Sequence, residues 1–249
     1  MTCSLHHISL NNNYFHLDQY HLLNLIIADT SLETIPINVF KHPSLKKIRN
    51  SGKKPKEILL DRSLHHFAMM SAKLDEDYKR GRPDILHTAL LNALATPLYQ
   101  RNHLRVFIHT VDNNVILVGN NVRFPKSYFR FEGLMLNLFR DKKIISEDGQ
   151  LLLDLRPNTN FGDLLKEFVK PEIVWGFSTT GTFKSLESIG ADLASYTNGC
   201  VVIGGFPKGY FSKNIDSYFN KKFSISDMGL ESQLIISRLL YEFEKNVLV

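Results

Sequence analysis

Three short segments in the last third of the sequence combine glycines and hydroxyl side chains directly after predicted strands: residues 177–181, 203–209 and 225–230. The carboxyl ends of parallel strands meet at one edge of a sheet, where open α/β folds bind their ligands. A glycine pair such as Gly204-Gly205 lets a ligand approach the backbone closely. Each segment alone is better explained as a structural turn, but the three together predict a binding pocket.

The same segments limit the kind of ligand. None has the glycine spacing of a dinucleotide-binding fingerprint or of a phosphate loop. The pattern therefore favours a cofactor that is recognised through its base and its methionine part. Ser226 or Asp227 is expected to cap the final helix, which leaves neighbouring backbone groups free for an adenine edge.

The run Arg-Gly-Arg-Pro-Asp-Ile-Leu-His at 80–87 places an arginine and a carboxylate at a predicted helix start. Pro83 suits the first helical position, where its missing N–H has no cost. Asp84 can serve as a general base, or it can hold the Arg82 guanidinium and favour the helix dipole, and the second role is favoured. His87, one turn later, is expected to be a packed or surface residue rather than a catalytic one.

A basic run interleaved with aromatic residues begins at Arg123. Arg123, Lys126 and Arg130 are spaced three and four apart, so a helix would place them on one face. Phosphate contacts combined with aromatic stacking are typical of proteins that bind single-stranded or loop RNA. The alternative is that the aromatics are core residues and the charges are simply solvated. The interleaved aromatics are Phe124, Tyr128, Phe129 and Phe131.

The surrounding elements predict a mostly parallel sheet covered by helices, with a β-hairpin elaboration. Thr30 and Glu33 have the form of a capping box, which predicts a helix directly after the first strand. We expect residues 1–20 to be an N-terminal extension and 21–249 to be one α/β domain with an inserted surface excursion near 140–170. The predicted strands are 22–28, 58–61, 105–110, 115–118, 173–177 and 200–203, and the main predicted helices are 64–74, 83–94, 186–196 and 230–243.

Composition narrows the class of protein further. The 249 residues carry a net charge of +5, which favours a polyanionic partner only weakly. No apolar run approaches the length of a membrane helix, so an intracellular protein is expected. Two distant cysteines, Cys3 and Cys200, exclude zinc-finger spacing, and adjacent histidine pairs favour no metal site. The lysine-rich stretch at 41–56 fits a solvated linker better than a dedicated RNA arm.

With these blocks in view, the sequence resembles the ribosome-biogenesis pseudouridine methyltransferases of the SPOUT class, the nucleolar essential protein family, and especially its archaeal members. Four blocks occur in the family's order, and the resemblance covers roughly residues 22 to 246. Lys126 departs from the eukaryotic pattern, which has arginine there; lysine keeps the charge but loses the bidentate fork. The blocks are 80–87, 123–135, 203–209 and 225–230.

The resemblance implies a knotted SPOUT-type α/β fold, a homodimer and S-adenosyl-L-methionine as cofactor. It implies methylation of ring nitrogen 1 of a pseudouridine in small-subunit rRNA, in the cytoplasm or, for a eukaryotic source, the nucleolus. The expected catalytic residues are Arg82 and Asp84, and the expected RNA-binding residues are Arg82, Arg123, Lys126 and Arg130. The expected cofactor-binding residues are Phe177, Ser178, Gly204, Gly205, Lys208, Gly209, Ile225, Ser226, Asp227, Met228, Gly229 and Leu230.

Two other functions stay open at this stage. One is a non-catalytic assembly factor that binds pre-rRNA and keeps the cofactor pocket only for stability. The other is a small-molecule enzyme of a generic α/β fold. The basic run around Arg123 separates this hypothesis from those that involve RNA, because a small-molecule enzyme does not need it. Binding of S-adenosylhomocysteine separates an intact cofactor site from a degenerate one.

Overall fold

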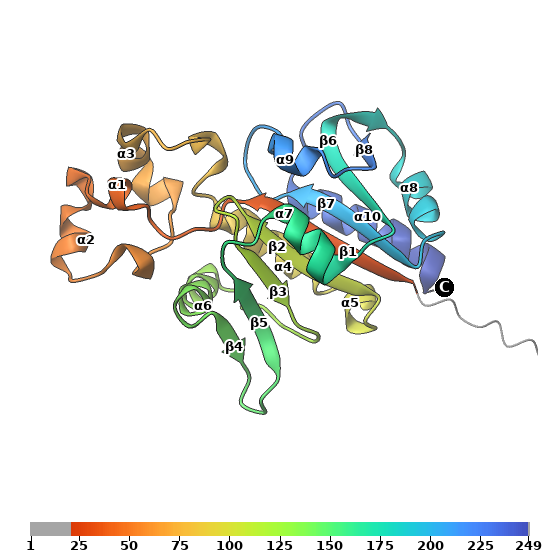
Figure 1. The fold of residues 1–249 in the computed structure, drawn as a ribbon, viewed down its shortest axis with the longest axis horizontal. Coiled ribbons are helices and arrows are strands. Elements are labelled where there is room, and N and C mark those ends of the chain that lie inside the picture. The colour runs from red at the N-terminus through yellow and green to blue at the C-terminus, as the bar shows by residue number, and fades with distance from the viewer. Residues whose placement is uncertain (1–20, 249) are drawn as a thin grey trace, which may run out of the picture.

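An eight-stranded sheet forms the centre of the protein, in the order β4-β5-β3-β2-β1-β7-β6-β8 (Figure 1). The computed structural model describes residues 21–248, so the predicted extension at 1–20 lies outside the described residues. The strands are β1 (Leu22–Thr30), β2 (Leu104–Thr110), β3 (Val115–Val118), β4 (Lys143–Ile145), β5 (Leu151–Arg156), β6 (Ile173–Phe183), β7 (Asn198–Gly204) and β8 (Lys221–Ser224).

The helices fall into two groups by length. The longer ones are α3 (Arg62–Ala72), α4 (Pro83–Ala93), α6 (Tyr128–Asp141), α8 (Leu186–Leu193) and α10 (Ser232–Val247). Short helical turns are α1 (Ile37–Phe40), η1 (Pro43–Leu45), α2 (Lys46–Asn50), η2 (Pro55–Glu57), η3 (Asp77–Lys79), α5 (Pro97–Gln100), α7 (Phe161–Asp163), the π-helical η4 (Leu164–Val169) and α9 (Lys213–Asp216).

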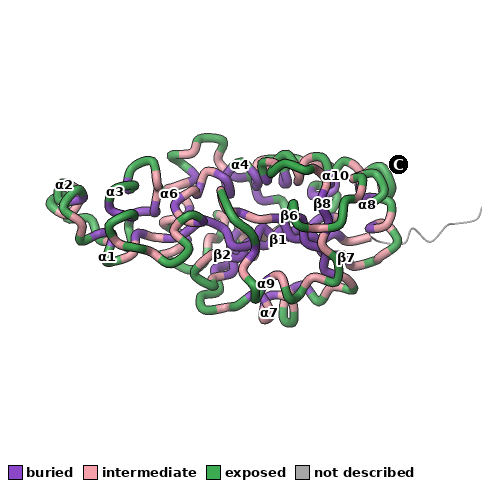
Figure 2. The backbone as a smooth tube through the Cα atoms, turned by 90° about the horizontal axis from the view of Figure 1, so that it is seen from above, coloured by how far each residue is buried: buried purple, intermediate pink, exposed green. Residues whose placement is uncertain are grey.

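Strand β1 shows why the sheet is covered on both faces. Its alternate residues Leu23, Leu25 and Ile27 join a core with α4, α6, α8 and α10. Ile26 and Ala28 point the other way, into a second core with α7, η4 and α9. Figure 2 shows the two helical layers on opposite sides of the buried strands. A strand that is apolar on both faces is typical of a helix-covered parallel sheet.

Pairing within the sheet confirms the predicted mostly parallel arrangement. Strands β2, β1, β7, β6 and β8 are parallel neighbours, and β3, β5 and β4 add antiparallel pairs at one edge. The predicted hairpin is confirmed as β2 and β3, in which His109 pairs with Val115. The parallel strands place the carboxyl ends of β6, β7 and β8 at one edge.

The chain leaves β1 into an insert, residues 31–82, which has a small core of its own around Val39, Leu60 and Met69. The predicted capping box is wrong: no helix starts after β1, because the Thr30 hydroxyl donates to the Ile27 carbonyl. The predicted strand at 58–61 is also wrong, since it forms only an isolated bridge through Leu59. Its apolar residues instead fill the core of the insert.

The prediction of a surface excursion near 140–170 needs correction. Residues 143–156 form β4 and β5, which extend the sheet, and Leu153 and Leu155 are buried in the main core. Phe161 and Leu164 then cover the opposite face. The charged residues of this segment alternate with apolar ones, so a half-buried strand looked like a loop. Among residues 21–248, every helix is too short or too polar to cross a bilayer.

Candidate cofactor pocket

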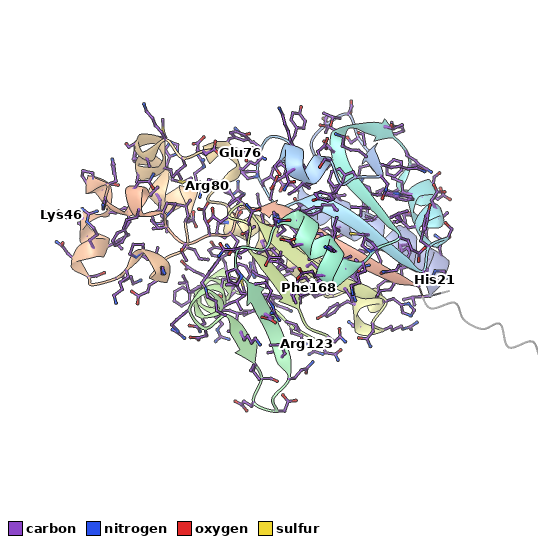
Figure 3. The ribbon with its side chains drawn as sticks, viewed as in Figure 1. His21, Lys46, Glu76, Arg80, Arg123 and Phe168 are labelled. Atoms are coloured by element: carbon purple, nitrogen blue, oxygen red, sulfur yellow. The ribbon has the colours of Figure 1, made fainter. Side chains whose placement is uncertain are left out.

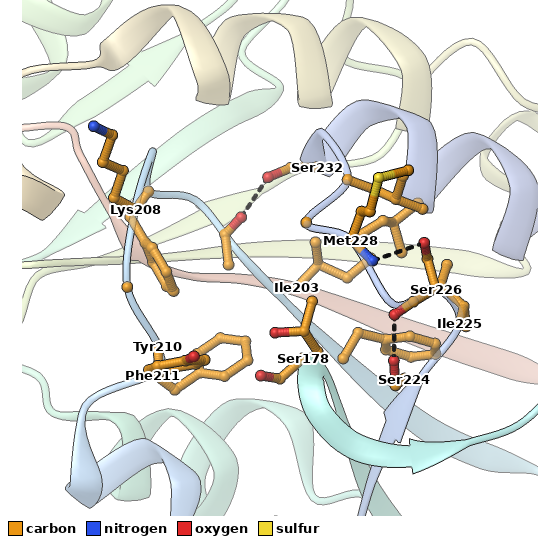
Figure 4. Close-up of a pocket in the computed structure, with 18 of the residues that line it drawn as sticks. Ser178, Ile203, Lys208, Tyr210, Phe211, Ser224, Ile225, Ser226, Met228 and Ser232 are labelled. Atoms are coloured by element: carbon orange, nitrogen blue, oxygen red, sulfur yellow. Dashed lines mark hydrogen bonds between the residues drawn. The ribbon is translucent and has the colours of Figure 1, made fainter.

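A cavity of about 320 Å³ opens where the three glycine-containing segments meet (Figure 4). The segments lie in the last part of β6, at the end of β7 and directly after β8, so the predicted edge of the sheet is the edge that carries the pocket. Most of the residues expected to bind a cofactor line it: Phe177, Ser178, Gly204, Lys208, Gly209, Ile225, Ser226, Met228, Gly229 and Leu230.

Strand β6 supplies one wall through an irregularity. Phe223 of β8 is the register partner of both Phe177 and Thr182, so the residues between them loop out beside the cavity. Gly181 makes this possible, because a Cβ atom there would lie 2.5 Å from the backbone carbon of Phe223. The strand therefore continues to Phe183, beyond the predicted end at Phe177.

Hydroxyl groups fix the other two walls. The Ser232 hydroxyl, at the start of α10, donates to the Gly204 carbonyl at 2.6 Å. The Ser224 hydroxyl donates to the Ser226 carbonyl at 2.7 Å, and the Met228 amide donates to the Ser226 hydroxyl at 3.1 Å. These bonds, drawn in Figure 4, tie the β7 and β8 turns to regular elements and preorganise the cavity.

Backbone groups on the cavity remain available to a ligand. Within the part of the chain that the structure describes, the amides of Lys208, Gly209, Gly229 and Leu230 form no hydrogen bond. Gly209 has a φ of +96°, and its backbone passes close to the Tyr78 ring, so a side chain there would be strained. Free amides beside apolar walls suit a flat heteroaromatic base.

Three of the predicted cofactor residues are placed differently from the expectation. Gly205 does not line the cavity; it packs on β1, where a Cβ atom would lie 2.5 Å from the Thr30 hydroxyl. Asp227 lines a neighbouring shallow hollow instead. Lys208 lines the cavity with its stem, while Figure 4 shows its ammonium group directed away from the other labelled residues. The expected cap by Ser226 or Asp227 is wrong, because Glu231 is the N-cap of α10.

A buried ion network supports the segment that follows β7. Asp29, at the end of β1, accepts from the Lys79 ammonium at 3.3 Å and from the Ser212 amide at 2.8 Å. Lys79 is 1% exposed and lies 5.3 Å from the centroid of the Phe206 ring, which lines the cavity. Sequence reasoning missed this network; a charged residue ending the apolar strand β1 was the available signal.

Other lining residues were also missed. Four of them, Thr179, Ile203, Phe206 and Pro207, lie inside the predicted segments without having been named as cofactor-binding residues, and the others lie within two positions of a segment or near the start of α10. The missed residues are Thr179, Ile203, Phe206, Pro207, Tyr210, Phe211, Phe223, Ser224, Ser232 and Ile235.

Arg82 and Asp84 form a two-pronged ion pair at the start of α4. The Arg82 Nε and Nη2 atoms donate to the two Asp84 carboxylate oxygens at 2.8 and 2.7 Å. Burial raises the pKa of Asp84, but hydrogen bonds from Arg82 and its charge outweigh this, and the net pKa is lower than usual. Arg82 also interacts with the charge of Glu231, which lies between the cavity residues Leu230 and Ser232. Neither Arg82 nor Asp84 lines the cavity itself, although the charge of Arg82 is felt by Glu231 beside it.

His87 is a packed residue, as predicted. It is 5% exposed, stacks on Phe131 at 4.6 Å between ring centroids, and its Nε2 atom lies 2.7 Å from the Pro125 carbonyl oxygen. This contact packs α4 against the connection that carries Arg123 and Lys126.

The expectation that Arg123, Lys126 and Arg130 share one helical face is wrong. Helix α6 begins only at Tyr128, so Arg123 and Lys126 lie on the connection before it. Pro125 removes a backbone donor and delays the helix. All three cations are exposed, and none lines the cavity. Figure 3 shows Arg123 at the lower centre of the view, well separated from Arg80 of the insert.

The interleaved aromatics divide between the two interpretations. Phe124 and Phe131 are buried in the main core, and Tyr128 is half-buried. Phe129, by contrast, is 80% exposed and follows the cations on the outer surface. Within residues 21–248 no cluster of three histidine, cysteine or acidic side chains has metal-binding geometry, and burial raises the pKa of the Cys200 thiol.

The parallel sheet and the cavity at the carboxyl ends of its strands are typical of an α/β enzyme domain. Residues 25–244 match the family model described as EMG1/NEP1 methyltransferase. The chain belongs to the EMG1/NEP1 methyltransferase family.

Similar proteins come from archaea. "Ribosomal RNA small subunit methyltransferase Nep1" of Pyrococcus furiosus is 37% identical over 227 residues, covering 91% of this chain and 98% of the relative. The protein of the same name from Staphylothermus marinus is 39% identical over 219 residues, covering 88% and 93%. The crystal structure of Archaeoglobus fulgidus Nep1 bound to S-adenosylhomocysteine matches with a TM-score of 0.75 and 31% identity, covering 91% and 98%. The match confirms the predicted fold class.

Proposed function

We propose that this protein transfers a methyl group from S-adenosyl-L-methionine to ring nitrogen 1 of a pseudouridine in small-subunit rRNA. The observation that carries the proposal is the convergence of three separate segments on one cavity. The relatives named as small-subunit rRNA methyltransferases, and the relative crystallised with S-adenosylhomocysteine, support the reaction class.

The cavity residues fit the proposed cofactor. Phe177, Ile203 and Ile235 offer apolar walls to the adenine ring, and the free amides near Gly229 and Leu230 can bind its polar edge. The Ser178 hydroxyl, which accepts the Thr180 amide at 3.3 Å, lines the cavity where a polar group of the amino-acid part can exchange for this local contact. When bound, the cofactor supplies an electrophilic methyl group on a sulfonium. The cavity residues hold that group at a fixed position, and such positioning supplies much of the rate in a displacement reaction.

Arg82 is proposed to stabilise the negative charge that develops on the target base. Nitrogen 1 of pseudouridine carries a proton because the sugar is attached through carbon. When that proton leaves to solvent, negative charge spreads onto the ring carbonyl oxygens. The charge is neutralised as the new nitrogen–carbon bond forms and the carbon–sulfur bond breaks. A guanidinium placed beside the pocket lowers the energy of this charge. Asp84 keeps Arg82 oriented through two hydrogen bonds.

Arg123, Lys126 and Arg130 are proposed to bind phosphates around the target loop. All three are exposed, and Phe129 beside them offers an exposed ring for base stacking. The packing of His87 against Pro125 and Phe131 keeps this surface attached to the start of α4, next to Arg82. The target base must be presented from a loop or flipped to reach the pocket.

A homodimer is proposed, in the cytoplasm or, for a eukaryotic source, in the nucleolus. Large apolar side chains near the cavity stay exposed in one copy: Met228 at 68%, Phe183 at 73% and Tyr210 at 59%. Mixing an Arg82→Ala variant with a Gly204→Val variant tests a shared site. Partial recovery of activity in the mixture supports active sites built from two chains. A mixture that stays inactive contradicts such shared sites.

The function is tested by incubating the protein with radiolabelled S-adenosyl-L-methionine and RNA hairpins that differ only in uridine or pseudouridine at one loop position. Labelling of the pseudouridine hairpin alone is expected. Equal labelling of both RNAs contradicts the base specificity. Tight RNA binding without labelling of either supports a non-catalytic assembly factor.

A further inference from the structure

A second, larger groove lies away from the cofactor pocket, between the insert and helix α6. It has a volume of about 1120 Å³, and η2 of the insert forms one wall while α6 forms the other. Figure 1 shows the insert and α6 as neighbours at the same end of the molecule. Nothing in the proposed reaction uses this groove.

The rim of the groove is cationic. Lys53, Lys54 and Lys56 lie on the insert side, and Arg140 and Lys142 lie on the α6 side, all of them exposed. The two acidic residues on the lining are already engaged. The Glu57 carboxylate accepts the Lys54 backbone amide at 2.8 Å, and Asp112 pairs with Arg80 at 3.2 Å. Asp141 holds Arg140 only through an exposed ion pair, which exchanges readily for a phosphate.

The floor of the groove is apolar. Ile35, Leu136, Phe139 and Leu155 contribute to it between the two basic rims. A basic rim above an apolar and aromatic floor fits single-stranded nucleic acid, whose phosphates bind the cations while its bases pack on the floor. A duplex buries its bases and has no use for such a floor.

Helix α6 links this groove to the surface proposed to bind the target loop. Arg130, Gly133, Asn137 and Arg140 are spaced three and four apart, and all are exposed, so they form one continuous stripe. The stripe runs for about 15 Å at 1.5 Å per residue. It starts at a proposed phosphate ligand and ends on the rim of the groove.

Gly133 is a second, independent feature of the stripe. A Cβ atom at this position would meet no atom within 4 Å, so packing does not require glycine in the middle of α6. Glycine there costs the helix about 1 kcal/mol relative to alanine. Its absence of a side chain leaves space for a partner to lie close to the helix backbone.

We infer that the groove between η2 and α6 binds a single-stranded RNA segment that flanks the target loop. The inference rests on the proposed function in taking RNA as the ligand. The three lysines of the insert then act as phosphate ligands, and the lysine-rich stretch is part of the substrate-binding surface rather than a solvated linker. Lys46, at the far end of the insert in Figure 3, lies outside this surface.

The test compares two triple variants that remove the same charge from the same insert. The groove variant is Lys53→Ala, Lys54→Ala and Lys56→Ala; the control is Lys41→Ala, Lys46→Ala and Lys47→Ala, whose lysines are exposed and do not line the groove. Each is titrated at several salt concentrations with a fluorescent pseudouridine hairpin, and with the same hairpin carrying single-stranded extensions on both ends.

The groove variant is expected to lose affinity for the extended RNA only, and the logarithmic salt slope should fall by about 0.7 for each lysine that contacts a phosphate. Its labelling of the short hairpin should equal that of the natural protein. Gly133→Gln should reproduce the loss of affinity for the extended RNA without lowering the melting temperature of the protein. The inference is overturned if the groove variant binds the extended RNA like the natural protein, or if the control weakens binding as much. The binding comparison does not depend on catalysis. If the natural protein labels neither RNA, this result therefore counts against the proposed function and not against the groove.

Discussion

The cofactor cavity and the base of the insert are stabilised by opposite kinds of interaction. The cavity is shaped by glycines, hydroxyls and backbone groups, and of the described residues that line it Lys208 alone is charged. The base of the insert is held by buried ion pairs, Lys79 with Asp29 and Arg80 with Glu33. Substitutions in the cavity should therefore act on ligand affinity, whereas substitutions at the base of the insert should act on folding.

The largest expected effect is the loss of Glu33. Its carboxylate is 1% exposed and binds Arg80 through two hydrogen bonds, so Glu33→Ala leaves a partly buried guanidinium without its main partner. Removing one member of a buried pair costs about 3–5 kcal/mol. Urea unfolding should show a loss of this size.

The matched control is Asp84→Ala, which breaks a pair whose side chains are 42% and 48% exposed. An exposed pair contributes at most about 1 kcal/mol. Equal destabilisation by Glu33→Ala and Asp84→Ala would remove the distinction between the two regions.

Gly204→Ala should weaken cofactor binding without unfolding the protein. The added Cβ atom would lie 2.7 Å from the Phe206 ring, which must then shift at the cavity wall. We expect S-adenosylhomocysteine affinity to fall about thirtyfold, equivalent to about 2 kcal/mol. Gly199→Ala, in the same strand, meets only ordinary contacts from 3.6 Å outward and should leave affinity unchanged. A Gly204→Ala protein that binds normally would mean that this wall does not touch the ligand.

Asp84→Asn separates a positioning role from a general base. The lowered pKa keeps Asp84 ionised throughout the neutral range, and the contribution of its charge is lost only as the pH falls through that pKa, below the usual range of an aspartate. If Asp84 only orients Arg82, the variant should lose about tenfold in kcat/KM. Its pH profile above pH 5 should match that of the natural protein. A loss of a thousandfold or more, with a changed pH profile, would identify Asp84 as the base.

The smallest expected effect is at Lys126. Lys126→Ala should reduce RNA affinity a few-fold and lower the logarithmic salt slope by about 0.7. Lys126→Arg keeps the charge and should leave the slope unchanged. A slope that is the same for all three proteins would show that this side chain contacts no phosphate.

Sequence reasoning located the pocket well because turn chemistry is local. Phe177 and Gly204 lie in the carboxyl-terminal parts of β6 and β7, and Gly229 precedes α10; parallel strands bring such positions together without further information. It failed where long-range packing decides. Glu33 looked like part of a capping box, but it pairs with Arg80, forty-seven residues later.

The basic run shows the same limit. Spacing alone placed Arg123, Lys126 and Arg130 on a helix, yet Pro125 and the packing of Phe124 into the core delay the helix start to Tyr128. Periodicity reports which residues could share a face, whereas the burial of neighbouring side chains decides where the helix begins.

Isothermal titration with S-adenosylhomocysteine tests most directly whether the turns after β6, β7 and β8 form a methyl-donor site. Saturable binding with one site per chain is predicted, together with loss of the heat signal in a Gly204→Val protein that remains folded. No binding to the natural protein, or undiminished binding to the Gly204→Val protein, would contradict the assignment of this cavity.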